Sequence, residues 1–436
     1  MQAVVQGFLS QSAKMDPLER VRRWKRSLDG YISFRKAVLL ALVIFAFILY
    51  VGPSIFSWLF SSNHRRHYDS PKSCIEDKLA NLYKEDLLHL NGHIVHNPWR
   101  AQTDSNYLLY VGNGYFGIVT DSHESSFNIK LSGQQRVLGA PVNFKPLVKI
   151  TQDNDFSRGR VAEKSSAAII SYTHGLSHKV DCYSDSDLGS NGIAGIGVEP
   201  EFSVSQHIYA HRAIPQILVQ EVKLSNPTGS DKLFNLERIG ISNWNAAESH
   251  SKRIEHGDGG KQYVVVTGTV LVNPAGSQFQ MFPSASRKEQ HSFVVIVAPK
   301  LEENIIVKAG QTHSLRILTS IVYSESMPSE QLKKVDKVDL EEKAVNAIVQ
   351  AVGMSTEQLR LRHSEVWKDL WTTGFGISHS MAESAVNGGQ INATIYYVLS
   401  HSPTPLHSLQ STPEDKTELM EHLAYSEGCY GNLPTL

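Results

Sequence analysis

FSVSQHIYAHRAIPQILVQEVKL, residues 202–224, contains two runs rich in β-branched and aromatic residues on either side of a short segment with a proline. Runs of this kind, bounded by turn residues, are typical of neighbouring β-strands. Similar runs recur between residues 107 and 323, among them YLLYV, YFGIV, FNIKL, AAIISY, YVVVTGTVLV, SFVVIV and SLRILTSIVY. About a dozen strands with no helix between them predict a large antiparallel β-sandwich rather than a parallel sheet with crossovers.

Helical patterns begin after the last of these runs. Residues 338–352 and 356–371 are predicted helices, and the second opens with Ser355-Thr356-Glu357-Gln358, which matches a capping box with Ser355 as the N-cap. Residues 391–399, INATIYYVL, suit either a strand or a buried helix, and periodicity does not decide between them.

The first part of the chain predicts a membrane topology. Residues 37–60 contain no charged residue, and these 24 residues are long enough to cross a hydrocarbon core as one helix. More basic residues precede this segment than follow it, so the positive-inside rule predicts a cytosolic N-terminus and a luminal or extracellular remainder. We therefore expect a basic tail (1–36), a transmembrane signal-anchor (37–60) and a stem (61–98) with one helix near residues 75–90, acting as a spacer or a small docking helix.

Cysteine and asparagine positions fit this topology. Cys74, Cys182 and Cys429 all lie on the predicted luminal side, where they can form at most one internal disulfide and leave one thiol over. The sequence does not determine which two pair. Asn392-Ala393-Thr394 is the one usable N-glycosylation acceptor, because a proline blocks Asn226-Pro227-Thr228, and we expect Asn392 to carry a glycan.

Composition excludes several classes of protein. The chain has 42 basic and 43 acidic residues in 436, a balance that argues against nucleic-acid binding. The three cysteines are isolated from one another and lack zinc-ligand spacing. His207 and His211 share one face of a predicted strand, but no third ligand is identifiable, so a structural role is favoured over a metal site. No cofactor is expected.

Two further motifs match catalytic or metal-binding patterns by letter only. Asp153-Asn154-Asp155 and Asp185-Ser186-Asp187 match the metal-binding pair of glycosyltransferases, but they lie in an all-β region and are better explained as turns. GNGYFGIV, residues 112–119, matches both the dinucleotide fingerprint and the kinase glycine-rich loop, with Lys130 following. A strand rather than a helix should follow this loop, and no kinase catalytic motif follows His211-Arg212. We expect a hairpin turn at Asn113-Gly114 and no nucleotide.

Four segments carry a family resemblance. Residues 115–119, 219–228 (VQEVKLSNPT), 367–371 and 392–405 (NATIYYVLSHSPTP) resemble an animal family of uncharacterised single-pass membrane glycoproteins. Members of that family continue well beyond the length of this chain, which implies that the chain is a truncated product.

A more distant likeness is to sugar phosphorylases and glucosidases that join an N-terminal β-supersandwich to a helical linker and an α/α toroid. NGYFG at 113–117, YAHR at 209–212 and WKDLW at 367–371 resemble their early turn, their YAHR strand and their linker helix. The likeness implies a supersandwich over 99–325, a helical linker over 326–374 and a truncated toroid start over 375–436, with residues 396–399 in a helix. The general acid of that clan comes from later toroid helices, so no catalytic residue is transferred.

These observations together predict a mainly β, membrane-anchored protein of the endoplasmic reticulum, the Golgi or the cell surface. Its expected function is carbohydrate or protein binding without catalysis in this chain, and its expected partners are a membrane and a glycan or luminal protein. Two alternatives stay open: a truncated glycan-processing hydrolase or phosphorylase, and a scaffold of the secretory pathway.

Overall fold

The computed structural model describes residues 71–84, 91–96, 107–121, 126–132, 137–152, 163–184, 202–241, 244, 247–254, 260–272, 289–372, 388–409 and 412–417. All of these residues belong to one compact unit, His67–Leu436. The predicted basic tail and signal-anchor lie outside the described residues. Within the described part, no helix has the length and hydropathy needed to cross a membrane.

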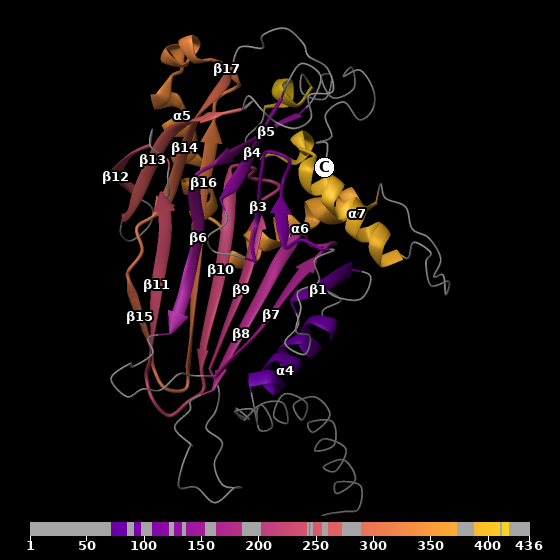
Figure 1. Cartoon of the computed structure of the whole chain (residues 1–436). Coiled ribbons are helices and arrows are strands. Elements are labelled where there is room, and N and C mark those ends of the chain that lie inside the picture. The colour runs from indigo at the N-terminus through magenta and orange to yellow at the C-terminus, as the bar shows by residue number, and fades with distance from the viewer. Residues whose placement is uncertain are drawn as a thin grey trace, which may run out of the picture. The chain divides into compact units, whose positions relative to one another are not determined.

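A ten-stranded antiparallel sheet forms the centre of the fold (Figure 1). Its strands follow the order β1, β7, β8, β9, β10, β16, β14, β13, β12, and β17 pairs with β14. Their bounds are β1 Gly92–His96, β7 Glu163–Ser171, β8 Leu176–Ser184, β9 Phe202–Ala210, β10 Ile217–Asn226, β12 Glu248–Ile254, β13 Lys261–Leu271, β14 Gln290–Pro299, β16 Gln311–Tyr323 and β17 Met327–Pro328.

Two smaller antiparallel sheets complete the strands. One has the order β15 (Asn304–Val307), β11 (Lys232–Ile241), β6 (Phe144–Gln152). The other has the order β2 (Tyr110–Gly112), β3 (Phe116–Val119), β4 (Phe127–Ser132), β5 (Val137–Val142). The predicted class, mainly β with antiparallel sheets, is confirmed, and the described residues between β1 and β17 contain no helix.

Several strands escaped the sequence analysis. β1 lies within the predicted stem and pairs with β7, so the sheet begins earlier in the chain than residue 107. β12, with the sequence ESHSKRI, is largely exposed at the opposite edge of the sheet. An edge strand is solvated and tolerates polar residues, which hides it from a search for apolar runs.

Strand alternation gives the large sheet two covered faces. On β9, Ile208 and Ala210 join a core cluster that contains Phe116 and Ile129 of the four-stranded sheet. The intervening Tyr209 joins a different cluster with the helices after the sheet. Because successive side chains point to opposite faces, the small sheets, together with residues 393 and 396 and Trp367, cover one side, and helices alone cover the other.

Three helices lie on that second face: α4 (Pro71–Lys84), α5 (Lys337–Val352) and α6 (Thr356–Trp371). The predicted capping box of α6 is confirmed, since the Ser355 hydroxyl accepts from the Gln358 N–H at 3.1 Å and the Gln358 side chain accepts from the Ser355 N–H at 2.8 Å. Residues 388–401 form helix α7 (Gly388–His401), as the toroid-clan resemblance implied.

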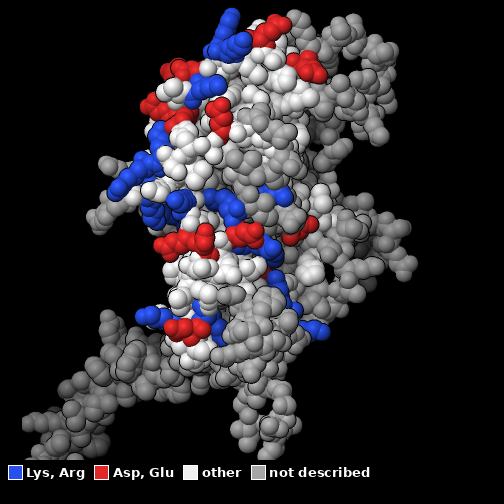
Figure 2. Space-filling model, turned by 60° about the vertical axis from the view of Figure 1, so that its left-hand side comes forward, with Lys and Arg blue, Asp and Glu red and all other residues white. Residues whose placement is uncertain are grey.

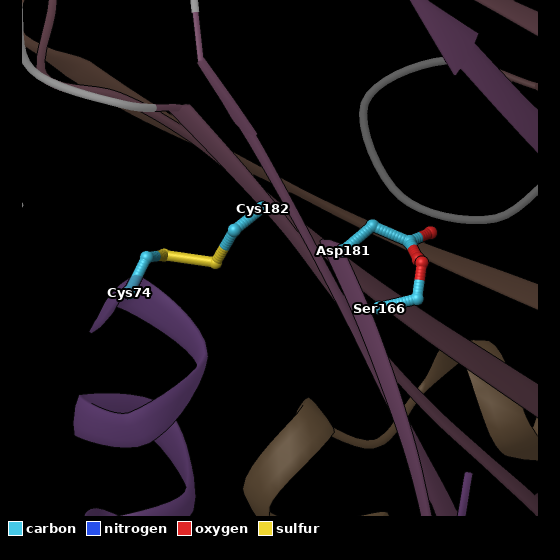
Figure 3. The surroundings of a disulfide bond; sticks show 4 residues. All are labelled: Cys74, Ser166, Asp181 and Cys182. Atoms are coloured by element: carbon cyan, nitrogen blue, oxygen red, sulfur yellow. A yellow bond between two sulfur atoms is a disulfide. The ribbon is translucent and has the colours of Figure 1, made fainter. Parts of the chain in front are cut away.

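The predicted stem helix docks on the sheet. Ile75 and Leu79 of α4 pack against Ile169 and Val180 of β7 and β8. A disulfide joins Cys74 to Cys182, which confirms that one internal bridge forms and identifies the pair (Figure 3). Cys429 lies outside the described residues. Figure 3 also shows Asp181 pointing away from α4, on the other face of β8.

Candidate functional site

The predicted turn at Asn113-Gly114 joins three parts of the molecule. It connects the antiparallel strands β2 and β3, so the hairpin is confirmed and a strand follows the glycine-rich motif. The Asn113 Nδ2 donates to the carbonyls of His211 (3.0 Å) and Pro215 (2.8 Å). Gly114 has a φ of +85° and donates its N–H to the Ser400 carbonyl of α7 at 3.1 Å. These contacts give the motif a structural role.

Arg212 is buried at the same junction. Its Nη1 donates to the Ser402 carbonyl at 2.7 Å and its Nη2 to the Leu399 carbonyl at 2.5 Å, at the C-terminal end of α7. The guanidinium also lies 4.4 Å from the ring centroid of Trp367. Burial lowers the pKa of Arg212 to about 9, yet the group stays protonated at neutral pH. The partial negative charge of the helix terminus stabilises this cation, which binds α7 to the sheet.

The two predicted histidines occupy different environments. His211 is buried, with its Nε2 at 3.0 Å from the Leu359 carbonyl and its Nδ1 accepting the N–H groups of Ala213 and Ile214. This pattern assigns a neutral ring with the proton on Nε2. Burial lowers the pKa of His211 to about 4. Contacts of this kind are those of a structural histidine.

His207 belongs to a polar cluster around the buried carboxylate of Glu221 on β10. The Tyr209 hydroxyl donates to Glu221 at 2.8 Å, Arg360 of α6 forms an ion pair with it, and the His207 Nδ1 lies 3.7 Å away. Burial raises the pKa of Glu221, but hydrogen bonds from His207, Arg360 and Tyr209 outweigh it, and the net shift is downward. The cluster attaches α6 to the sheet.

The remaining predicted site residues are scattered. Asn392 is half-buried on α7, and Lys130 is half-buried on β4, where burial lowers its pKa. The two Asp-x-Asp pairs, at 153–155 and 185–187, lie outside the described residues. Among the residues that the structure describes, no group of three or more His, Cys, Asp or Glu side chains could hold a metal ion.

A cleft of about 900 Å³ lies between the three-stranded sheet and the β12–β14 end of the large sheet. β6, β11 and β15 line one side, and β12, β13 and β14 line the other. Val264, Val266 and Ala298 supply an apolar wall, and the lining also includes carboxylate, amide, hydroxyl and cationic residues. A concave site with an apolar wall and a few polar groups is the usual form of a ligand-binding site.

Strand β11 places a cation at this cleft. Phe234 and Leu236 face the large sheet and pack in a core cluster, and Arg238 follows with the same alternation. Its Nη1 donates to the Pro299 carbonyl of β14 at 2.7 Å, which confirms the inward direction. The Arg238 Nε and Nη2 are buried and have no hydrogen-bond partner within the described part of the chain.

A β-bulge adjoins this arginine. The register between β11 and β6 shifts between Arg238 and Gly240, opposite Pro146 and its neighbours. Bulges locally redirect side chains and are frequent beside binding sites. Burial lowers the pKa of Arg238 to about 10, so its side chain remains cationic at neutral pH.

Other polar residues of the lining have unused hydrogen-bonding capacity. Asn235 of β11 and its register partner Asn304 of β15 are not among these residues, because strand alternation turns both amides away from the large sheet. Across the described residues, the side chains of Ser249, Lys300 and Glu303, which also line the cleft, make no hydrogen bond or ion pair. They are available to a polar ligand.

The sequence analysis missed all of these cleft residues, because β11 has mixed polarity and was not predicted as a strand. One local signal exists: Phe234, Leu236 and Arg238 share an alternate-residue pattern. An arginine that continues an inward apolar pattern indicates a buried cation.

Comparison with known proteins gives a family and distant relatives. A family model described as "Uncharacterized conserved protein (DUF2152)" matches residues 20–436. The "Uncharacterized protein KIAA2013 homolog" of Xenopus tropicalis is 25% identical over 329 residues, covering 75% of this chain and 48% of that protein. Its Xenopus laevis counterpart is 26% identical over 229 residues, covering 52% of this chain and 35% of that protein.

Two more distant similarities involve sugar enzymes. The "Protein-glucosylgalactosylhydroxylysine glucosidase" of Dictyostelium discoideum is 22% identical over 307 residues, covering 69% of this chain and 36% of that protein. Among solved structures, a "Putative kojibiose phosphorylase from human microbiome" aligns with a TM-score of 0.42 and 9% identity, covering 68% of this chain and 39% of that one. The chain spans between 35% and 48% of the length of the relatives it matches in sequence.

Proposed function

The chain belongs to the DUF2152 family of uncharacterized conserved proteins, and we propose that it binds carbohydrate in the cleft between the three-stranded sheet and strands β12–β14. The observation that carries this proposal is the set of polar lining side chains without protein partners beside an apolar wall. Hydroxyl, ammonium and carboxylate groups hydrogen-bond sugar hydroxyl groups, and an apolar wall accommodates the C–H face of a sugar ring.

One sequence relative supports the same substrate class. It is named as a protein-glucosylgalactosylhydroxylysine glucosidase. Its similarity covers 69% of this chain, so a saccharide ligand is the chemistry that this distant relationship favours. We further propose that the chain consists of a β-supersandwich, a helical linker and the start of an α/α toroid. In this proposal the chain binds a saccharide and does not catalyse a reaction on it.

A location in the secretory pathway is part of the proposal. The disulfide between Cys74 and Cys182 supports an oxidising compartment, because such bonds persist in secreted and luminal proteins. We propose a single membrane span at residues 37–60, with a cytosolic N-terminus and a luminal remainder. Asn392 then faces the glycosylation machinery.

Saccharide binding is tested with the full chain on a glycan array, followed by calorimetric titration of the strongest ligand. The double variant Ser249→Ala and Glu303→Gln should weaken binding by about tenfold or more, since each lost hydrogen bond contributes about 1 kcal/mol. Asn128→Ala, at an exposed position on β4, is the matched control and should bind normally. Blank arrays, or equal affinity in the double variant, would refute the proposal.

The glycan at Asn392 has its own test. Expression in mammalian cells should give a protein whose gel mobility increases after treatment with peptide N-glycosidase. Asn392→Gln should abolish that shift, whereas Asn128→Gln should not. A shift that persists in Asn392→Gln, or no shift in the unaltered chain, would contradict this assignment.

A further inference from the structure

We infer that the ligand of the cleft carries a negatively charged group, a carboxylate or a sulfate or phosphate ester, which pairs with Arg238 and Lys300. This inference rests on the proposed saccharide-binding function and specifies its ligand as an acidic rather than a neutral oligosaccharide. The charged group would occupy one end of the cleft.

The guanidinium of Arg238 is the main observation. Its one hydrogen bond goes to the Pro299 carbonyl, and its Nε and Nη2 are buried without a partner in the described part of the chain. Leaving buried donors of a charged group unpaired is costly, so native proteins normally provide an acceptor. No carboxylate pairs with Arg238 among the described residues. An anionic ligand would supply both the acceptor and the missing charge.

Lys300 adds a second cation beside the first. It directly follows Pro299, whose carbonyl accepts the Arg238 hydrogen bond, so the backbone fixes the two residues close together. Lys300 is exposed, and its ammonium group has no ion-pair partner within the residues that the structure describes. A guanidinium fork and a neighbouring ammonium are well suited to bind a carboxylate, sulfate or phosphate.

The acidic residues of the lining lie near Arg238 along the chain. Glu237 directly precedes it but points to the opposite face of β11, because successive side chains of a strand alternate. Glu303 lies beside Leu236, whose N–H donates to the Glu303 carbonyl at 2.7 Å. Ser249 of β12 is the register partner of Val266 in the apolar wall. The cleft therefore offers the Ser249 hydroxyl and the Glu303 carboxylate for sugar hydroxyl groups and Arg238 for an anion.

The surface around the cleft does not by itself favour an anionic ligand. Figure 2 shows lysine and arginine side chains interspersed with aspartate and glutamate over one face of the molecule. A mixed surface creates no extended positive field that would attract any anion. Selectivity for an acidic saccharide would then depend on Arg238 and Lys300.

The test compares matched ligands on the full chain by calorimetric titration. A glucuronic-acid-containing disaccharide is measured against the same disaccharide after reduction of its carboxyl group, with sulfated and phosphorylated disaccharides as separate arms. We expect at least one acidic ligand to bind ten to a hundred times more tightly than its neutral counterpart, with an affinity that falls as sodium chloride is raised. The arm with the highest affinity identifies the anion.

Two variants test whether Arg238 and Lys300 cause the preference for acidic ligands. Arg238→Gln and Lys300→Gln should each weaken acidic-ligand binding about tenfold and leave neutral-ligand binding unchanged. Lys300 is exposed, so its variant keeps the test valid if Arg238→Gln does not fold. Arg253→Gln removes the same charge from an exposed position on β12 outside the cleft lining and should have no effect.

Three results would overturn the inference. If neutral and acidic ligands bind equally, or if the acidic preference survives in Lys300→Gln and Arg238→Gln, the anion site is wrong while saccharide binding stands. If no saccharide binds, the proposed function and the inference both fail.

Discussion

Arg212 carries a buried positive charge that no described carboxylate neutralises, and the carbonyls of Leu399 and Ser402 bind it instead. Trp367 covers one side of the guanidinium. At the scale of single residues, this arrangement shows how the YAHR segment contributes: its arginine attaches α7 to the strands. A lysine in the same place would keep the positive charge but lose the planar guanidinium that donates to several carbonyls at once.

Replacement of Arg212 should therefore destabilise the protein. Arg212→Lys removes at least one of three charge-assisted hydrogen bonds, to the carbonyls of Asn113, Leu399 and Ser402, and is expected to lower the free energy of unfolding by about 2 to 3 kcal/mol. Urea denaturation followed by tryptophan fluorescence measures the change. Arg362→Lys, at an exposed position on α6, is the control and should leave the midpoint unchanged. An unaltered midpoint in Arg212→Lys would contradict this role.

Gly114 makes a second residue-scale prediction. Its φ of +85° and its close contact with the backbone of Ser402 and Pro403 leave no room for a methyl group. Gly114→Ala should cost about 2 to 4 kcal/mol from backbone strain and overpacking together. Gly229→Ala, where a Cβ would meet nothing within 4 Å, is the matched control. Equal melting temperatures for the two variants would show that the turn adapts.

At the scale of helices and strands, α4 is attached to the sheet both by apolar packing and by a covalent bond. Ile75 and Leu79 pack on β7 and β8, and Cys74 is bonded to Cys182. The bond closes a loop with a sequence separation of 108 residues. A helix that the sequence describes as part of a stem is therefore a component of the folded domain.

Loss of this bond should destabilise the domain. The double variant Cys74→Ser and Cys182→Ser is expected to lose about 4 kcal/mol, since a cross-link over a long loop restricts the unfolded chain. Denaturation midpoints with and without reductant measure the effect. Reductant should shift the midpoint of the unaltered protein and not that of the double variant. A reductant-sensitive double variant would show that another disulfide is responsible.

At the scale of the whole molecule, buried neutral histidines link several elements. Burial lowers the pKa of His211 and of His401 to about 4, and it lowers the pKa of His178 and His363 as well. Unfolding exposes these rings and returns each pKa to about 6.5. As the pH falls below 6.5, the unfolded chain binds protons first, so stability decreases.

Acid should therefore weaken the fold between pH 6.5 and about 4, with His211 alone contributing about 3 kcal/mol across that range. Above pH 6.5 these histidines should have no effect. Urea midpoints measured at intervals from pH 7.5 to 4 test this expectation. His211→Asn should reduce the slope, and His313→Asn, at an exposed position, should not. A flat profile below pH 6.5 would contradict the assignment.

The sequence by itself determined the local elements. Short apolar runs predicted β9, β10, β13, β14 and β16, and the capping box at Ser355 predicted the start of α6. Asn113-Gly114 predicted a hairpin turn. Each of these signals arises from residues a few positions apart, whose backbone preferences and face alternation depend little on the rest of the chain.

Only the tertiary structure decided the disulfide pair, the role of α4 and the cleft. The cleft residues come from positions between 144 and 304, and strand pairing places Asn235 opposite Asn304. Only the tertiary structure shows that Arg238 donates one hydrogen bond, to the Pro299 carbonyl, and that its Nε and Nη2 have no partner among the described residues. Contacts between distant residues depend on the register of several strands at once, and no local pattern encodes that register.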